Sequence, residues 1–218
     1  MSPSIPVSRR AQSLGEEICN SLSHGAALVA AIGAAPFLIL HATGEGDVAR
    51  VVGASVFAAT VILLYLASTL YHSLPHGKGK RIFRALDHAA IFLLIAGTYT
   101  PFTLGVLSGP WGWSLFGVVW GLATVGVLLK GLGRLGHPVL STGLYVSMGW
   151  VVLVALKPLL ENLPAAGLAW LLAGGLAYTA GVVFYAFDAR LRYGHFIWHL
   201  FVLAGTTCHY TAVFLYAA

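Results

Sequence analysis

The feature of this sequence that most constrains its fold is a succession of long apolar runs. They lie at about 18–42, 49–72, 85–107, 112–130, 139–156, 165–187 and 194–217. Each run is long enough for a helix across a hydrocarbon core, which is about 30 Å thick and takes about 20 residues to cross. Only 9% of the residues are charged, against about 25% in soluble domains. The sequence therefore excludes a soluble globular protein and predicts an all-α, polytopic membrane protein with a bundle of seven transmembrane helices.

The segments between the apolar runs are too short to form a second domain. They contain Gly, Pro or charged residues, and short connections of this kind join neighbouring antiparallel helices. The first run is longer than the roughly 7–15 apolar residues of a signal-peptide core, so we expect it to be retained. We expect a polar cytoplasmic segment over residues 1–17 and one transmembrane domain over residues 18–217. The spacing of Gly117 and Gly121 predicts close packing by the fourth helix.

The basic residues indicate how the bundle is oriented. With seven spans, only Arg50 and Lys157 lie on the side opposite the N-terminus. Ten basic residues lie on the N-terminal side, namely Arg9, Arg10, Lys78, Lys80, Arg81, Arg84, Lys130, Arg134, Arg190 and Arg192. Because cytoplasmic loops carry the excess of Lys and Arg, we expect the N-terminus in the cytoplasm and the C-terminus outside. The net charge of +5 is then an orientation signal, and we expect no nucleic-acid partner.

Ionisable residues inside the spans need an explanation, because an Asp at a helix centre costs about 2.5–3.5 kcal/mol of insertion free energy. Three clusters of polar residues stand out, at the end of the second run, the start of the third and the start of the last: Ser68-Thr-Leu-Tyr-His72, Leu86-Asp87-His88 and His195-Phe-Ile-Trp-His199. Residues four positions apart lie on the same face of a helix. The first and third clusters therefore each present two polar groups in one direction.

The expected topology brings these clusters to one depth of the membrane. His72 ends an inward helix, whereas Asp87 and His195 begin outward helices, so the three meet near the cytoplasmic leaflet. Three histidines with an open fourth position are the ligand set of a catalytic zinc, and imidazole suits zinc better than it suits Mg²⁺ or Ca²⁺. We predict Zn²⁺ ligands at His72, His195 and His199. Asp87 would hold or activate a water molecule, and Ser68 would support the ligands or donate to an oxyanion.

The other histidines are expected to lie outside this site. His209 lies ten residues beyond His199, roughly 15 Å along a helix, and we expect it to make a structural hydrogen bond. His88 lies about 100° around the helix from Asp87 and should face a neighbouring helix or the interface. We expect Asp188 to form an ion pair in its loop. Interfacial positions are expected for His24, His41, His76 and His137.

In these motifs the chain resembles the progestin and adipoQ receptor (PAQR) family, in its bacterial hemolysin III branch. The matching segments are the Ser68 to His72 motif, the Leu-Asp-His segment that runs on to Gly97-Thr-Tyr-Thr-Pro101, and the His195 to His199 motif. The resemblance begins at Asn20-Ser-Leu-Ser-His-Gly25 and extends to the last span. It implies a seven-helix bundle in the bacterial plasma membrane, with the N-terminus inside, zinc on the three histidines and Asp87 near the reacting water. It also implies a relationship to membrane hydrolases that include alkaline ceramidases.

Two classes of function follow from these observations. In the first, the protein is a zinc-dependent hydrolase of a lipid amide or ester. A membrane lipid would enter sideways as its substrate, past Tyr71, Thr98 and Tyr99. In the second, it is not an enzyme but a pore-forming cytolysin, as the name hemolysin suggests, or a sensor or regulator of membrane lipid homeostasis with structural zinc. A pore needs polar groups through the whole bilayer depth, whereas here they gather in one leaflet, which disfavours an open channel.

Overall fold

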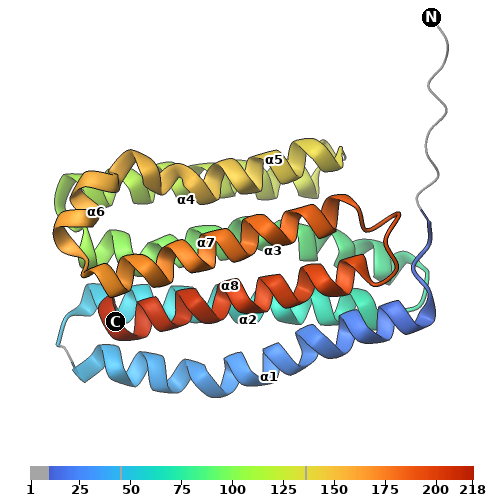
Figure 1. Cartoon of the computed structure of the whole chain (residues 1–218), viewed down its shortest axis with the longest axis horizontal. Coiled ribbons are helices and arrows are strands. Elements are labelled where there is room, and N and C mark those ends of the chain that lie inside the picture. The colour runs from blue at the N-terminus through green and yellow to red at the C-terminus, as the bar shows by residue number, and fades with distance from the viewer. Residues whose placement is uncertain (1–9, 45, 136) are drawn as a thin grey trace, which may run out of the picture.

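The computed structural model describes residues 10–44, 46–135 and 137–218, and all regular elements within these ranges are helical (Figure 1). This confirms the all-α expectation. The elements are α1 (Leu14–Gly44), α2 (Val48–Ser73), α3 (Lys78–Pro101), a π-helical segment (Phe102–Val106), α4 (Gly109–Gly131), α5 (Pro138–Gly149), a 3₁₀ segment (Trp150–Ala155), α6 (Leu156–Asn162), α7 (Ala165–Ala186) and α8 (Gly194–Tyr216).

Six helical stretches in the described ranges are long and apolar enough to cross a membrane. They are Leu14–Gly44, Val48–Ser73, Lys78–Val106, Gly109–Gly131, Val139–Asn162 and Ala165–Ala186. The last helix, α8, has 23 residues but is not among them, and three polar histidines interrupt its apolar sequence: His195, His199 and His209. The multi-pass character of the protein is thus supported, while the count of seven crossings and their orientation stay predictions.

The first helix begins earlier than the sequence indicated. α1 starts at Leu14, inside the polar segment expected over residues 1–17, of which residues 1–9 lie outside the described ranges. This brings Glu16 and Glu17 into the first turn of α1, where carboxylates interact favourably with the helix dipole. The polar residues that precede the apolar run are therefore part of the helical bundle.

The fifth predicted span, 139–156, is not one regular helix. The α-helical pattern stops at Gly149 and resumes at Leu156. The hydroxyl of Tyr99, from α3, lies in this break. It donates to the carbonyl oxygens of Met148 (3.1 Å) and Gly149 (2.7 Å) and accepts from the backbone N–H of Val152 (2.9 Å). A side chain inserted into the helical hydrogen-bond ladder is a known cause of such breaks.

Helices α2 and α3 form the centre of the bundle, with 56% of their most apolar windows buried. They approach closely at Gly97, where an added Cβ would overlap the side chain of Thr60. By contrast, Gly117 and Gly121 of α4 have no neighbouring atom within 4 Å of such a Cβ. The prediction that this glycine pair packs closely is therefore wrong for contacts within the described chain, because that face of α4 points outward.

One end of the bundle gathers the polar motifs. The start of α1, the end of α2, the start of α3 and the start of α8 lie at this end (Figure 1). Elsewhere the outer surface is apolar, with side chains such as Val29 and Phe37 about 70% exposed. Since lipid-facing surfaces are apolar, the polar end is the part of the molecule where a functional site is expected.

Candidate metal centre

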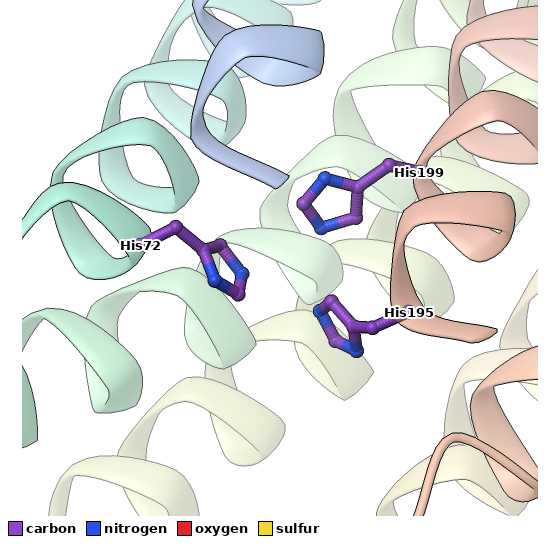
Figure 2. Close-up of side chains that lie close together, drawn as sticks. All are labelled: His72, His195 and His199. Atoms are coloured by element: carbon purple, nitrogen blue, oxygen red, sulfur yellow. The ribbon is translucent and has the colours of Figure 1, made fainter. Parts of the chain in front are cut away.

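Three histidines from two helices converge at the polar end. His72 comes from the end of α2, and His195 and His199 come from the first turns of α8. One ring nitrogen of each lies within 4.8 Å of the others, and the three rings point toward one another (Figure 2). His72 and His199 are buried, and His195 is partly buried. The spacing of four residues places His195 and His199 on the same face of α8.

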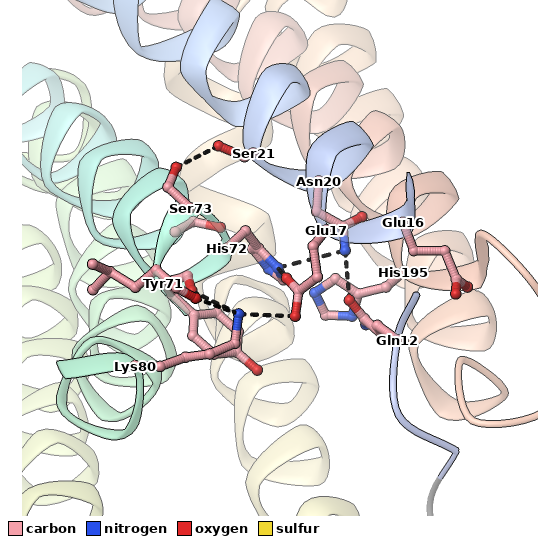
Figure 3. Close-up of polar contacts among 12 residues, drawn as sticks. Gln12, Glu16, Glu17, Asn20, Ser21, Tyr71, His72, Ser73, Lys80 and His195 are labelled. Carbon is pink, nitrogen blue, oxygen red and sulfur yellow. Dashed lines mark hydrogen bonds and ion pairs between the residues drawn. The ribbon is translucent and has the colours of Figure 1, made fainter. Parts of the chain in front are cut away.

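The ring of His72 is held by a carboxylate from another helix. Its Nδ1 lies 2.7 Å from Oε2 of Glu17, in the first turn of α1 (Figure 3). Its Nε2 is buried and has no hydrogen-bond partner in the described chain. With the proton on Nδ1 donated to Glu17, Nε2 keeps a free lone pair that faces the other two histidines.

The other two rings are held in the same way. Nδ1 of His195 lies 3.2 Å from Oδ2 of Asp188. Nδ1 of His199 lies 3.2 Å from the backbone oxygen of Asn20 and 3.1 Å from Oγ of Ser23. Histidines that bind metals usually donate their second ring N–H to a carboxylate or a carbonyl. All three rings follow this pattern, so the buried group can hold a metal ion through its Nε2 atoms.

Glu17 also joins three helices around His72. Its Oε1 lies 2.8 Å from Nζ of Lys80 on α3. The same ammonium group donates to the backbone oxygens of Tyr71 (3.1 Å) and Leu74 (3.2 Å) at the end of α2. Figure 3 shows Glu17 between His72 and Lys80. The carboxylate therefore fixes the His72 ring and fastens the ends of α1, α2 and α3 together.

The start of α8 is fastened by the neighbouring carboxylate, Glu16. Tyr193 precedes α8 with a left-handed backbone (φ 59°), which is strained for a residue with a side chain. Its backbone N–H donates to Oε1 of Glu16 (2.9 Å), which also pairs with Arg10. Hydrogen bonding to Glu16 raises the pKa of Arg10, so the guanidinium stays charged. These contacts set the position at which α8 begins, and hence that of His195.

Ser68 is fully buried, and its partner is a histidine that sequence reasoning placed elsewhere. Its Oγ lies 2.7 Å from Nδ1 of His24 on α1. The expectation that His24 is interfacial is wrong, because the residue is 3% exposed and its ring stacks on His199 with centroids 3.5 Å apart. The Nε2 of His24 is buried without a hydrogen-bond partner in the described residues. Ser68 thus contacts the histidine group through His24.

Asp87 is buried in the third turn of α3, which begins at Lys78, and it is not bonded to the three convergent histidines. Its Oδ2 lies 3.4 Å from Nδ1 of His88, and its charge acts on both His72 and His24. The hydrogen bonds of the described chain do not join it to the three convergent rings. The roles predicted for Asp87 and Ser68 therefore stay predictions.

Two further expectations about single residues can be compared with the structure. His209 donates from Nε2 to the backbone oxygen of Leu171 (3.2 Å), which confirms a structural hydrogen bond. Asp188 was expected to pair within its loop, but it accepts from the ring of His195. The loop before α8 folds back against the first turn of that helix, where Asp188 lies next to Gly194. Asp188 therefore pairs with His195, a candidate metal ligand.

Sequence reasoning missed the contribution of α1 to the site. Glu17, Asn20 and His24 all face the histidine group through their side chains, and Asn20 also contacts His199 through its backbone oxygen. Their spacing of three and four residues places them on one face of a helix. This polar stripe, which runs from the first turn of α1 into an apolar helix, is the signal that could have revealed them.

Two cavities lie along the helices that carry the histidines. The larger, about 950 Å³, opens at the polar end and is lined by His195, Glu17, Tyr71 and several cations. The smaller, about 360 Å³, is mainly apolar, and its lining includes Thr98 and Tyr99 of α3 and Trp198 and Val202 of α8. The predicted lining residues therefore divide between the two, with Tyr71 at the polar cavity and the other two at the apolar one.

Comparisons with known proteins agree over nearly the whole chain. The family described as "Haemolysin-III related" matches residues 12–210. "Hemolysin-3" of Bacillus cereus is 44% identical over 96% of this chain and 95% of its own length. "Hemolysin-3 homolog" of Bacillus subtilis (strain 168) is 42% identical over 92% of this chain and 94% of its own. The human "Monocyte to macrophage differentiation factor", a PAQR protein, is 28% identical over 92% of this chain and 84% of its own. No solved structure gives a significant match.

Proposed function

Because this multi-pass membrane protein belongs to the haemolysin-III-related family, the bacterial branch of the PAQR group, we propose that its three-histidine centre holds zinc and hydrolyses an amide or ester bond of a membrane lipid. The observation that carries the proposal is the shared geometry of the three rings. Each has its Nδ1 bonded to an acceptor, which leaves the Nε2 atoms to converge.

The donor set favours zinc over other common metals. Three neutral imidazoles suit zinc, whereas Mg²⁺ and Ca²⁺ prefer oxygen ligands. Zinc with three protein ligands keeps an open position, where it acidifies water and polarises a carbonyl group. The buried, unpartnered Nε2 of His72 fits this assignment, because an orphaned polar atom in a membrane span carries a free-energy cost that a bound ion removes.

The surrounding residues are assigned to orientation and proton transfer. Glu17 and Asp188 hold the rings of His72 and His195. We assign to Asp87 the exchange of a proton with the reacting water and the leaving group. The hydroxyl of Ser68, held by His24, would donate to the developing oxyanion. The apolar cavity beyond the histidines would exclude water from the acyl part of the lipid.

The proposal includes the topology expected from the sequence. At 1.5 Å per residue, the 23 residues of α8 extend roughly 35 Å, enough for a seventh crossing. Most basic residues of the described chain belong to segments at the histidine end, whereas Arg50 and Lys157 lie at the other end, so by the positive-inside rule the histidine end is the cytoplasmic one. The centre would then lie near the cytoplasmic leaflet of the bacterial plasma membrane.

A second candidate function follows from the names of the relatives. "Hemolysin-3" describes a protein that lyses cells, so this chain would be a pore-forming cytolysin, or a lipid-responsive regulator in which zinc is structural. Against an open pore stands the distribution of buried ionisable groups, which lie at one end of the bundle. Dye leakage from liposomes separates the two, because leakage that survives removal of the three histidines would support a pore.

The test combines metal analysis with a lipid panel. Purified full-length protein should contain about one zinc per chain and release fatty acid from at least one lipid ester or amide, with loss on chelation and recovery with zinc. Asp87→Asn should keep the metal and lose the release. A zinc-loaded protein that releases no fatty acid from a broad panel would overturn the hydrolase assignment and leave a structural zinc.

A further inference from the structure

The larger cavity carries more positive charge than the carboxylates around it neutralise. Two carboxylates line it, Glu17 and Asp188, and both are engaged, the first by His72 and Lys80 and the second by His195. The cationic residues of the lining are Arg10, Lys80, Arg81, Arg84 and Lys130. Arg10 pairs with Glu16, and Lys80 with Glu17. Three cations are therefore left without a carboxylate partner in the described chain.

Two of these three cations, Arg84 of α3 and Lys130 of α4, line the cavity from different helices. No side chain of the described residues pairs with the guanidinium of Arg84. The ammonium of Lys130 donates only to neutral oxygens, the backbone oxygen of Leu135 and Oγ of Ser141, both at 3.0 Å. Both cations line the same cavity, where their like charges repel each other. Asp87 also acts on Lys130, but its carboxylate faces His88.

Along α3, charged residues that line the polar cavity are followed by apolar residues that line the smaller cavity. Arg81 and Arg84 line the polar cavity, and Ile91 and Leu94, further along the same helix, line the apolar one. α8 repeats the order, because His195 lines the first cavity and Trp198 lines the second. Along both helices, the residues of the cationic cavity, His195 among them, are followed by residues of the apolar cavity.

A phospholipid has the same order of chemical groups. Its phosphate is followed by the acyl ester carbonyls and then by the hydrocarbon chains. We propose that the larger cavity binds the phosphate of an anionic phospholipid headgroup through Arg84 and Lys130, which brings the acyl ester toward the three histidines. The identification of this lipid as the substrate rests on the proposed function, whereas the binding itself does not.

The charge balance favours an anionic headgroup over a zwitterionic one. A phosphate monoester carries a charge of about −1.5 to −2 near neutral pH, which balances the charges of Arg84 and Lys130, while Arg81 is the third cation of the lining without a carboxylate partner in the described chain. The quaternary ammonium of a choline headgroup would add a further positive charge beside these cations. Arginine binds phosphate through paired N–H groups, and charge-assisted hydrogen bonds of this kind are the stronger ones.

The test measures binding of a lipid that cannot be hydrolysed. Purified full-length protein in a neutral detergent is titrated with a short-chain diether phosphatidic acid, the corresponding diether phosphatidylcholine, and inorganic phosphate. We expect wild type to bind the phosphatidic acid most tightly. Arg84→Gln and Lys130→Gln should each weaken it about ten-fold, Arg84→Lys should keep most of the affinity, and Arg192→Gln should stay within about two-fold, since Arg192 lies at the same end outside the cavity.

Several outcomes would overturn the proposal. Equal weakening by Arg192→Gln, or equal affinity for the two lipids, would mean that the basic residues act only as a charged surface. Inorganic phosphate bound as tightly as the lipid would make the site one for free phosphate. The melting temperature and metal content of each variant are measured first, and affinities are compared only among variants that match wild type in both. If Arg84→Gln fails to fold, Arg84→Lys and Lys130→Gln still test the proposal. Binding as expected without any lipid hydrolysis would overturn the substrate assignment and leave the headgroup site intact.

Discussion

The buried polar residues of this protein satisfy their hydrogen bonds in two different ways, depending on where they lie. In the apolar part of the bundle, several of them are threonines whose hydroxyls donate to carbonyl oxygens of their own helix. Thr98, Thr100 and Thr206 reach the residue four positions earlier at 2.8, 2.8 and 2.9 Å. Such bonds are available to any threonine in a helix and need no neighbouring helix, although Trp120 and Tyr178 from other helices also bond to the hydroxyls of Thr100 and Thr206.

At the histidine end the partners come from other helices. Glu17 of α1 bonds to His72 of α2, and His24 of α1 bonds to Ser68 of α2. An ionisable group in a membrane is expensive and persists where it has a partner or a function. The difference teaches that a buried hydroxyl within a span says little about function, whereas a buried ring or carboxylate that depends on another helix marks a site.

The largest effect is expected from removing a histidine of the convergent group. His199→Ala should reduce the bound metal from about one ion per chain to background, because two remaining imidazoles do not hold zinc in such a site. The measurement is elemental analysis of purified protein. The matched control is His209→Ala, which removes a partly buried histidine from the same helix, one that bonds to a backbone oxygen. Metal retained by His199→Ala, or lost equally by His209→Ala, would contradict the assignment of the centre.

The three ligand candidates could be predicted from the sequence for a physical reason. The relation between His195 and His199 is local, because helical spacing alone puts them on one face. His72 could be added because successive helices run in opposite directions, which brings the end of α2 to the same end of the bundle as the start of α8. Glu17, His24 and Asp188 could not be placed in this way, since their roles depend on how α1 and the loop before α8 pack against other helices. The break after Gly149 has the same origin, because it depends on the hydroxyl of Tyr99 from another helix.

The second effect concerns the carboxylate that holds His72. Glu17→Gln should weaken metal binding about 10- to 100-fold, because an amide is a poorer acceptor for the Nδ1 proton and cannot pair with Lys80. Competition with a chromogenic chelator measures the change. Glu161→Gln serves as the control, since Glu161 is exposed and lies 4.0 Å from Lys157, and it should leave the affinity unchanged. An unaltered affinity in Glu17→Gln would show that this cross-helix bond is structural only.

The third effect tests the apolar region, where packing rather than hydrogen bonding is expected to matter. Gly97→Ala should lower the free energy of unfolding by about 1–3 kcal/mol, because the new Cβ would overlap Thr60 on α2. Gly117→Ala should be neutral or slightly stabilising, since nothing lies within 4 Å of its Cβ. Thermal unfolding in detergent compares the two. Equal stability of both variants would show that α2 and α3 do not approach each other as closely as described.

The smallest effect is expected where a hydroxyl serves only its own helix. Thr98→Val keeps the side-chain shape and removes the bond to the oxygen of Leu94, while that oxygen keeps its backbone partner. The free energy of unfolding should change by no more than about 0.6 kcal/mol, the average worth of a side-chain hydrogen bond between membrane helices, and metal content should not change. Thermal unfolding and elemental analysis of the same preparation check both values. A loss of metal in Thr98→Val would break the contrast between the two regions, since a residue of the apolar cavity would then support the histidine group across the bundle.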